Sequence, residues 1–153
     1  MFILNTWNRM KALPGGKWVF SRFVGQFAPY SGSIGACVRE LAPGNTKVTL
    51  RERRAVRNHL NSIHAVALMN LAELSSGLAM ISGLPDTVQG IVTAFHIEYF
   101  KKARGTITAI GQCDIPPAIT ERIEAKSHVK IYNTEKQLLC QATATWTLGP
   151  KKV

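Results

Sequence analysis

The sequence predicts an α+β domain in which a curved antiparallel sheet wraps around one long central helix. Three observations support this fold class. The segment 58–83 is apolar on nearly every side, and a helix of that kind is usually buried on every side. Four strand-like segments follow it, and two more precede it. A single buried helix among antiparallel strands is best covered by a sheet that curves around it.

The composition supports one domain with an ordinary core. The 153 residues are 46% hydrophobic and 18% charged, which argues against disorder. We expect a single domain over residues 1–153, with an N-terminal helical segment at 1–30 and the sheet-and-helix core at 33–149. The net charge of +10 favours an anionic partner, such as a phosphorylated ligand, nucleic acid or an acidic membrane surface. It does not choose among them.

Residues 1–30 mix aromatic and basic side chains, and Pro14-Gly15-Gly16 divides them into two short amphipathic helices. We expect these helices to pack on the sheet or to cover the mouth of a pocket. Contact with a membrane surface is the alternative. No cleavable signal peptide is predicted, because polar residues interrupt any apolar stretch here: Asn5, Asn8, Arg9 and Lys11.

The next segment predicts a β-hairpin. Ile34, Ala36 and Val38 alternate with smaller or polar residues, as in a strand. Pro43-Gly44-Asn45 predicts a turn, and Thr46 to Arg53 a second strand. A basic run follows, which we interpret as a solvated face: Arg51, Arg53, Arg54 and Arg57.

The central helix has expected start and stop signals and one unusual residue. Asn61 and Ser62 are predicted to cap its start, and Gly83 to end it. Glu73 is its only acidic residue. A buried carboxylate is costly unless it is paired or solvated, so Glu73 either meets water or a basic partner, or it is a catalytic group in a cleft. The helix is long enough to span a bilayer, but its polar residues favour a core helix: His64, Asn70, Glu73, Ser75 and Ser76.

Four strands complete the prediction, at Val88 to Phe100, Thr106 to Cys113, 122–132 and 138–148. In the first of them, one face is expected to carry Ile91, Thr93, Phe95, Ile97 and Tyr99. The last has the clearest alternation, with one face made of Leu138, Cys140, Ala142, Ala144, Trp146 and Leu148.

The three cysteines are scattered, and all lie in strand-like segments: Cys37, Cys113 and Cys140. Their odd number and irregular spacing indicate free thiols and a reducing cytoplasm. No metal-binding spacing, phosphate-binding loop or dinucleotide motif occurs, so we predict no metal site.

A motif at the start of the central helix resembles a known superfamily. Asn58 is followed six residues later by His64, and Leu71-Ala72-Glu73 ends nine residues beyond that histidine. This spacing resembles N-x-x-G-x-x-H-G-G-x-x-x-x-L-A-(D/E) of the hotdog-fold acyl-CoA thioesterases. The resemblance is closest to the phenylacetate-degradation type and to a related branch of unassigned function. The segment Glu98 to Gly105 also resembles that family's strand ending in tyrosine, followed by Ala-x-Gly.

The motif departs from the family at two places. Asn61 stands where the family often has glycine, and Ala65-Val66 replaces the paired glycines. In the family, the backbone N–H of the first of these glycines stabilises the oxyanion. Ala65 supplies the same group if its backbone geometry permits, whereas Val66 narrows the cleft.

The resemblance implies a role for each matching residue. Glu73 activates water or attacks the thioester carbonyl, and the Ala65 N–H stabilises the oxyanion. Asn58 orients water or its own loop, and His64 holds the turn; purely structural roles for both remain open. Tyr99 and Asn61 are expected to line the substrate site. Three basic residues are expected either to meet the phosphates of coenzyme A or to form a solvated turn: Lys101, Lys102 and Arg104.

The sequence therefore predicts a cytoplasmic hotdog-fold enzyme that hydrolyses a fatty or aromatic acyl-CoA. Coenzyme A enters as part of the substrate, and no separate cofactor is expected. The resemblance implies a homodimer or a dimer of dimers. The alternative is a non-catalytic protein that binds acyl-CoA or fatty acid. Nucleic-acid binding is not expected, because aromatic residues are not interleaved with the basic runs.

Overall fold

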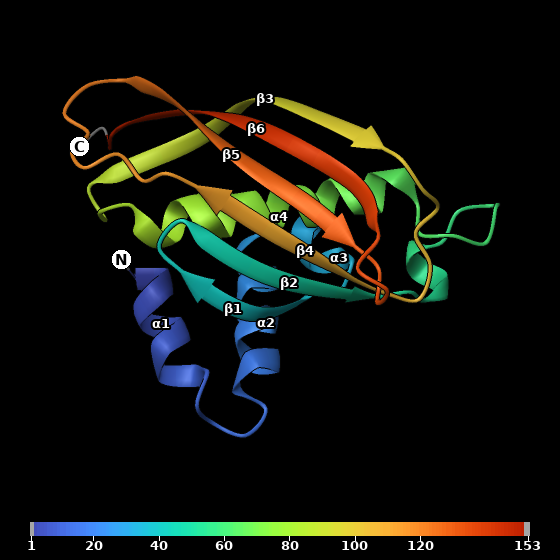
Figure 1. Cartoon of the computed structure of the whole chain (residues 1–153). Helices are drawn as coiled ribbons and strands as arrows, with labels where there is room; N and C mark the ends of the chain where they lie inside the picture. The colour runs from blue at the N-terminus through green and yellow to red at the C-terminus, as the bar shows by residue number, and fades with distance from the viewer. Residues whose placement is uncertain (1, 152–153) are drawn as a thin grey trace.

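Six antiparallel strands form one curved sheet in the computed structural model, which describes residues 2–151 (Figure 1). The strand order is β1-β2-β4-β5-β6-β3, so β1 and β3 are the two edges. The strands have the following bounds: β1 Cys37–Ala42, β2 Asn45–Arg51, β3 Val88–Tyr99, β4 Thr106–Cys113, β5 Ile123–Tyr132 and β6 Leu138–Pro150.

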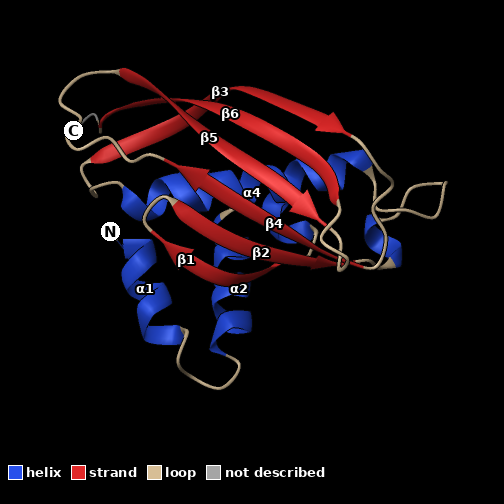
Figure 2. Cartoon of the chain, in the orientation of Figure 1, coloured by secondary structure: helices blue, strands red, loops and turns tan. Residues whose placement is uncertain are grey.

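The concave side of this sheet holds the long helix α4, Ala65–Gly83 (Figure 2). Leu71, Ala72 and Met80 of α4 are fully buried. The approach of sheet to helix is close: the Thr46 hydroxyl of β2 donates to the Ser75 carbonyl at 2.9 Å. At Gly111 of β4 a Cβ atom would lie 2.7 Å from the same carbonyl oxygen, so only glycine fits there. The predicted fold class is confirmed.

The start of α4 differs from the prediction. The residue that caps it is His64, whose Nδ1 accepts a hydrogen bond from the Val66 N–H at 3.1 Å. Asn61 and Ser62 instead lie in the preceding loop, so their prediction as caps is wrong. The helix does end at Gly83, and Leu84 forms its C-cap.

One side of α4 stays uncovered in the single chain, contrary to the expectation of burial all round. Val66, Met69 and Ile81 are 50%, 37% and 46% exposed. Their spacing places them on one stripe of the helix, with Glu73 and Gly77 between them. By length and composition α4 is the one helix within residues 2–151 that could cross a membrane, yet 67% of its most apolar window is buried. Its burial is that of a core helix.

Edge strand β3 carries a bulge that changes which residues face the core. The register between β3 and β6 shifts between Val92 and Ala94. Phe95 and Ile97 pack against the core, whereas Ile91 on the other side of the bulge is 62% exposed. The prediction that Ile91 and Phe95 share one face is therefore wrong, because a bulge reverses the alternation.

The other strands agree closely with their predicted bounds. The hairpin turns at Gly44, which has a φ of 73°, although β1 begins at Cys37, three residues later than expected. Alternate residues of β6 are buried as predicted, from Cys140 to Leu148.

All three cysteines are free. Burial raises the pKa of Cys113 to about 11 and that of Cys140 to about 12, so both are inert thiols.

Three helices precede the sheet, not two: α1 Phe2–Met10, α2 Gly16–Phe27 and the short α3 Pro29–Ser33. α1 and α2 form a hairpin that projects from the body of the fold (Figure 1). Its interior is held by Trp7 and Phe20, which are buried and meet edge to face at 5.0 Å between ring centroids.

Candidate active site

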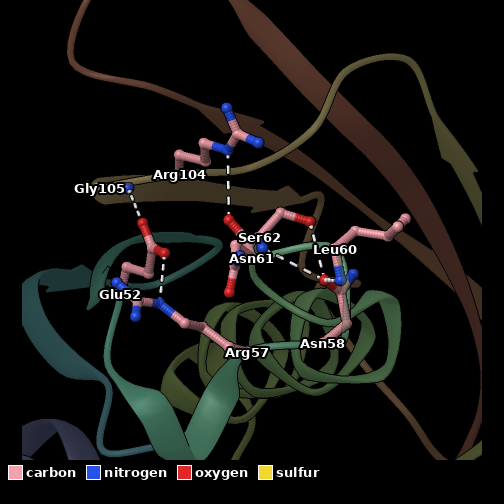
Figure 3. A network of polar contacts seen from close by, with 8 residues as sticks. All are labelled: Glu52, Arg57, Asn58, Leu60, Asn61, Ser62, Arg104 and Gly105. Carbon is pink, nitrogen blue, oxygen red and sulfur yellow. Dashed lines mark hydrogen bonds and ion pairs between the residues drawn. The ribbon is translucent and has the colours of Figure 1, made fainter.

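The loop before α4 is organised by the Asn58 side chain. Its Oδ1 atom accepts hydrogen bonds from the Leu60 N–H at 2.9 Å and from the backbone N–H and hydroxyl of Ser62, both at 3.2 Å (Figure 3). The Asn58 N–H in turn donates to the Ser62 carbonyl at 2.9 Å. The amide oxygen of Asn58 therefore shapes this loop, which is one of the two roles considered from the sequence.

Asn61 occupies the left-handed region of backbone space, with a φ of 52°. Glycine adopts this conformation without strain, and asparagine tolerates it better than most residues. Asparagine can therefore occupy a position at which the hotdog thioesterase motif often has glycine. The Asn61 carbonyl accepts a hydrogen bond from Arg104 Nε at 3.2 Å, which joins the loop to the segment after β3.

His64 and Ala65 together form the N-terminus of α4. Because His64 Nδ1 accepts from Val66 N–H, a neutral His64 carries its proton on Nε2. Ala65 is the first helical residue, so its N–H has no acceptor within the helix. Both residues are exposed. The Ala65 N–H is thus available at the positive end of the helix dipole, where an oxyanion would be stabilised.

The end of β3 and the segment after it lie against this helix start. The Tyr99 hydroxyl donates to the Ala65 carbonyl at 3.0 Å, and the Ile63 N–H donates to the Ala103 carbonyl at 2.8 Å. Burial raises the pKa of Tyr99, which keeps its hydroxyl a donor at neutral pH. Lys101 and Lys102 are exposed, and their ammonium groups meet no acceptor within residues 2–151.

Glu52 joins the loop before α4 to the segment after β3. The sequence does not indicate this role, because Glu52 stands among basic residues. It accepts the Gly105 N–H at 2.5 Å and Arg57 Nε at 2.6 Å (Figure 3). The hydrogen bond from Gly105, followed by that from Arg57, lowers the pKa of Glu52. The four arginines of the basic run are exposed as predicted, although Arg53 also donates to the Ser33 carbonyl at 2.9 Å.

Glu73 lies away from these loops, in the middle of α4. It is half-buried, and burial raises the pKa of its carboxyl group. The Ser31 hydroxyl of α3 donates to Glu73 Oε2 at 3.4 Å and opposes this shift. No basic side chain pairs with Glu73 among the residues that the structure describes. Its carboxylate is therefore less stable than an ordinary surface carboxylate and more basic, as a general base needs to be.

Glu73 lines a mainly apolar groove of about 630 Å³. One wall comes from α4 and the start of β3, and the other from the N-terminal helices. Phe2, Phe23 and Phe27 stand on the second wall, in tilted and edge-to-face contact with one another. The N-terminal helices thus line this groove, and α2 also packs beside β1. A groove of this size and lining fits a small apolar ligand.

Asn70 is a second polar residue that the sequence did not single out as functional. It lies one turn before Glu73, and its Nδ2 donates to the Tyr30 carbonyl at 3.0 Å. Its Oδ1 is buried, and it is the one buried side-chain oxygen or nitrogen without a partner within residues 2–151. Asn70 and Glu73 together hold α3 against α4 through Tyr30 and Ser31. Nothing in the sequence of α3 signals these contacts.

The structure thus divides the expected site residues into two groups. Asn58, Asn61, His64, Ala65, Tyr99 and Arg104 come together at the start of α4, with Lys101 and Lys102 on the adjoining turn. Glu73 stands eight residues beyond Ala65, about 12 Å along the helix axis. One chain therefore does not bring its own Ala65 N–H and Glu73 carboxylate to the same carbonyl group.

The sequence matches one protein family over residues 16–148, which is most of the chain. That family is described as a domain of unknown function, DUF4442. The chain belongs to the DUF4442 family. No curated protein matches it.

Solved structures share the fold of this DUF4442 protein. A crystal structure described only as a genomics target is 29% identical, with a TM-score of 0.83 over 99% of this chain and 100% of that chain. A hypothetical thioesterase from Streptococcus pneumoniae, solved with coenzyme A, is 20% identical, with a TM-score of 0.70 over 84% and 99%. A thioesterase from Haemophilus influenzae is 15% identical, with a TM-score of 0.71 over 83% and 88%. The DUF4442 chain thus has the hotdog fold of proteins named as thioesterases.

Proposed function

We propose that this DUF4442 protein hydrolyses acyl-CoA thioesters, with Glu73 as the catalytic carboxylate. The observation that carries the proposal is the setting of Glu73. It is a carboxyl group of raised pKa, without a basic partner among the described residues, on the wall of an apolar groove. Such settings are frequent at catalytic sites, where an acid or base must be tuned to its task. The thioesterases of the same fold support the reaction class.

The proposed reaction consumes one water molecule. Glu73 takes a proton from the water as its oxygen attacks the thioester carbonyl carbon, and the carbonyl oxygen becomes an oxyanion. The oxyanion is stabilised by the N–H of Ala65 at a helix N-terminus. Collapse of the intermediate breaks the carbon–sulfur bond, and the proton held by Glu73 passes to the departing sulfur, so that the carboxylic acid and the coenzyme A thiol are released and Glu73 is again a carboxylate. In the direct-attack variant, the Glu73 carboxylate displaces the coenzyme A thiolate to form a mixed anhydride with the acyl group, and water then hydrolyses the anhydride to the carboxylic acid and Glu73, with the proton released by water passing to the thiolate.

The active site in this proposal is shared between two protomers. The separation of about 12 Å between Ala65 and Glu73 in one helix requires the oxyanion donor to come from a second chain. A two-fold axis beside α4 would set the start of one helix against the middle of the other. The exposed stripe of α4 supports this arrangement, because Val66, Met69 and Ile81 are apolar and flank Glu73. β3 is an edge strand, so the backbone groups along its outer side pair with no other strand among the described residues and can pair with a second chain.

The two halves of the substrate would then lie in different surroundings. The acyl chain would occupy the groove of about 630 Å³, whose walls are largely aliphatic and aromatic. The phosphates of coenzyme A would meet Lys101 and Lys102, whose ammonium groups are exposed beside the start of α4. Arg104 would contribute less, because its Nε already donates to the Asn61 carbonyl.

One observation favours the alternative of non-catalytic acyl-CoA binding. Val66 stands in place of a glycine, directly after the proposed oxyanion donor, and this residue is 50% exposed. A branched side chain there restricts the approach of a carbonyl group to the Ala65 N–H. Val66→Gly separates the two cases, because it should leave binding unchanged and raise turnover only if the site is catalytic.

The proposed function is tested by Glu73→Gln, which keeps the size of the side chain and removes its basicity. The kcat for acyl-CoA hydrolysis should fall about 10²- to 10⁴-fold, the usual contribution of a positioned base. Binding of a non-hydrolysable thioether analogue, measured by calorimetry, should persist. Glu124→Gln on β5 is the control for the loss of one negative charge. Wild-type turnover in Glu73→Gln excludes the catalytic assignment, and binding without turnover in the wild-type protein establishes the binding alternative.

A further inference from the structure

We propose that the tip of the α1–α2 hairpin, residues 11–19, docks on an anionic membrane surface. The tip lies at the end of the hairpin that points away from the sheet and α4 (Figures 1 and 2). None of its residues lines the groove beside Glu73. Trp18 lines a separate pocket between α2 and the start of β1. The proposal therefore stands on a surface that the proposed hydrolysis does not use.

The apolar side chains of the tip are large and exposed. Leu13, Trp18 and Val19 are 61%, 62% and 44% exposed, although leucine, tryptophan and valine are usually buried. Tryptophan in particular favours the interface between water and lipid, because its ring is apolar while its N–H remains a hydrogen-bond donor. An exposed cluster of this kind at the end of a projecting hairpin indicates a surface that inserts into a partner.

Positive charge surrounds this cluster. Lys11, Lys17 and Arg22 are exposed, and the Arg22 guanidinium lies over the Trp18 ring at 5.5 Å from its centroid. The first acidic residue of the whole chain is Glu40, so no carboxylate offsets these charges nearby in the sequence. Basic residues that flank an exposed tryptophan match a bilayer with anionic headgroups, in which the apolar groups enter the interface and the cations meet phosphate.

The hairpin holds the tip in a defined shape. Gly15 has a φ of 72°, and a Cβ atom at Gly16 would lie 1.8 Å from the Met10 carbonyl oxygen. Both glycines are therefore required for the tight turn. The buried contact between Trp7 and Phe20 fixes the two helices just above it. The exposed residues are thus presented by a rigid element, which lowers the entropic cost of docking.

Tryptophan fluorescence offers a direct test with the full chain. The chain has three tryptophans, of which Trp7 and Trp146 are 2% and 3% exposed, so a change on docking comes from Trp18. Vesicles of equal parts phosphatidylglycerol and phosphatidylcholine should shift the emission to shorter wavelength, and vesicles of phosphatidylcholine alone should not. Trp18→Phe should abolish the shift without preventing co-sedimentation with the anionic vesicles.

Two paired variants separate docking from general charge attraction. Lys11→Gln with Lys17→Gln should weaken binding to the anionic vesicles about fivefold for each lysine. Added salt should also weaken the binding of the wild-type protein to these vesicles. The matched control removes two exposed lysines of β5, Lys126→Gln with Lys130→Gln, and should retain most of the binding. Leu13→Ser with Trp18→Ser should lose the binding as well, with an unchanged melting temperature because both positions are exposed.

Three results would overturn the proposal. The first is equal binding to both kinds of vesicle, and the second is equal losses in the tip and β5 lysine variants. The third is a change of oligomeric state in Leu13→Ser with Trp18→Ser while vesicle binding persists, since the tip would then be an interface between copies of the chain. None of these results depends on hydrolysis, so the proposed function is tested separately.

Discussion

The Ser31 hydroxyl donates to Glu73 Oε2 at 3.4 Å, and this contact joins the short helix α3 to the middle of the central helix. Burial raises the pKa of Glu73, whereas the hydrogen bond from Ser31 lowers it, so the two effects oppose each other at one carboxyl group. The N-terminal helices therefore do more than form one wall of the groove. They supply the one side chain among residues 2–151 that stabilises the charged form of Glu73 by a hydrogen bond.

Removing that hydroxyl should change the pH dependence of hydrolysis. In Ser31→Ala, Glu73 keeps the burial that raises its pKa and loses the hydrogen bond that lowers it. The active form is the carboxylate, so the acid limb of the kcat/KM profile should move to higher pH. Activity on the plateau above the limb should change little. Ser33→Ala is the matched control, because the Ser33 hydroxyl donates to the Tyr30 carbonyl of its own helix and, among residues 2–151, does not contact Glu73. An acid limb that stays in place would show that Ser31 does not tune Glu73.

Much of the fold could be predicted because burial imposes a period on the sequence. In β6 one face packs on the core and the other is more exposed, so alternation from Cys140 to Leu148 identifies the strand directly. In α4 the absence of a polar face identifies a core helix. The bulge in β3 could not be predicted in the same way. It arises from the pairing of β3 with β6, which is a tertiary contact that leaves no local signal at Val92.

The site could be predicted only where its residues lie close together in the sequence. Asn58, His64 and Glu73 share one motif and were found by its spacing. The spacing of the motif does not indicate Ser31 or Glu52. Ser31 meets Glu73 across 42 residues of chain, and Glu52 meets Gly105 across 53. His64 caps α4, whereas the sequence predicts Asn61 and Ser62 as caps, because histidine is not among the preferred capping residues.

The groove should limit the length of the acyl chain. For saturated acyl-CoA substrates, kcat/KM should rise about fourfold with each methylene until the groove is filled, as expected for burial of an apolar chain. Gly77 lies one turn beyond Glu73 on the same side of α4 and lines the groove. In Gly77→Leu the rise should therefore stop at a shorter chain, with short substrates little affected. Gly77→Ala is the control, since a Cβ atom there meets Trp146 at an ordinary 3.5 Å. Identical profiles for wild type and Gly77→Leu would place the acyl chain elsewhere.

The turn after β3 should recognise the nucleotide half of the substrate. Lys101→Ala with Lys102→Ala should raise KM for an acyl-CoA about three- to tenfold, the range expected when two exposed ion pairs are lost. The KM for the corresponding acyl-pantetheine, which lacks the nucleotide phosphates, should hardly change. Lys126→Ala with Lys130→Ala on β5 removes the same charge at a distance. Equal effects on both substrates would mean that the turn does not bind phosphate.

The shared active site can be tested by mixing two inactive proteins. Ala65→Pro removes the proposed oxyanion donor with little strain, because proline is favoured at the first helical position and His64 already has the extended backbone that a following proline requires. Ala65→Gly, which keeps the N–H, is its control and should remain active. Ala65→Pro and Glu73→Gln should each be inactive alone.

After subunit exchange, half of the dimers should contain one chain of each kind. Each such dimer has one site in which an intact Ala65 N–H from the Glu73→Gln chain faces an intact Glu73 from the Ala65→Pro chain. Complete mixing should therefore restore about a quarter of the wild-type activity in a two-fold symmetric dimer. Exchange is followed independently by native mass spectrometry of chains with different tags. Proven exchange without recovered activity would mean that both groups act within one protomer, or that Ala65 does not stabilise the oxyanion.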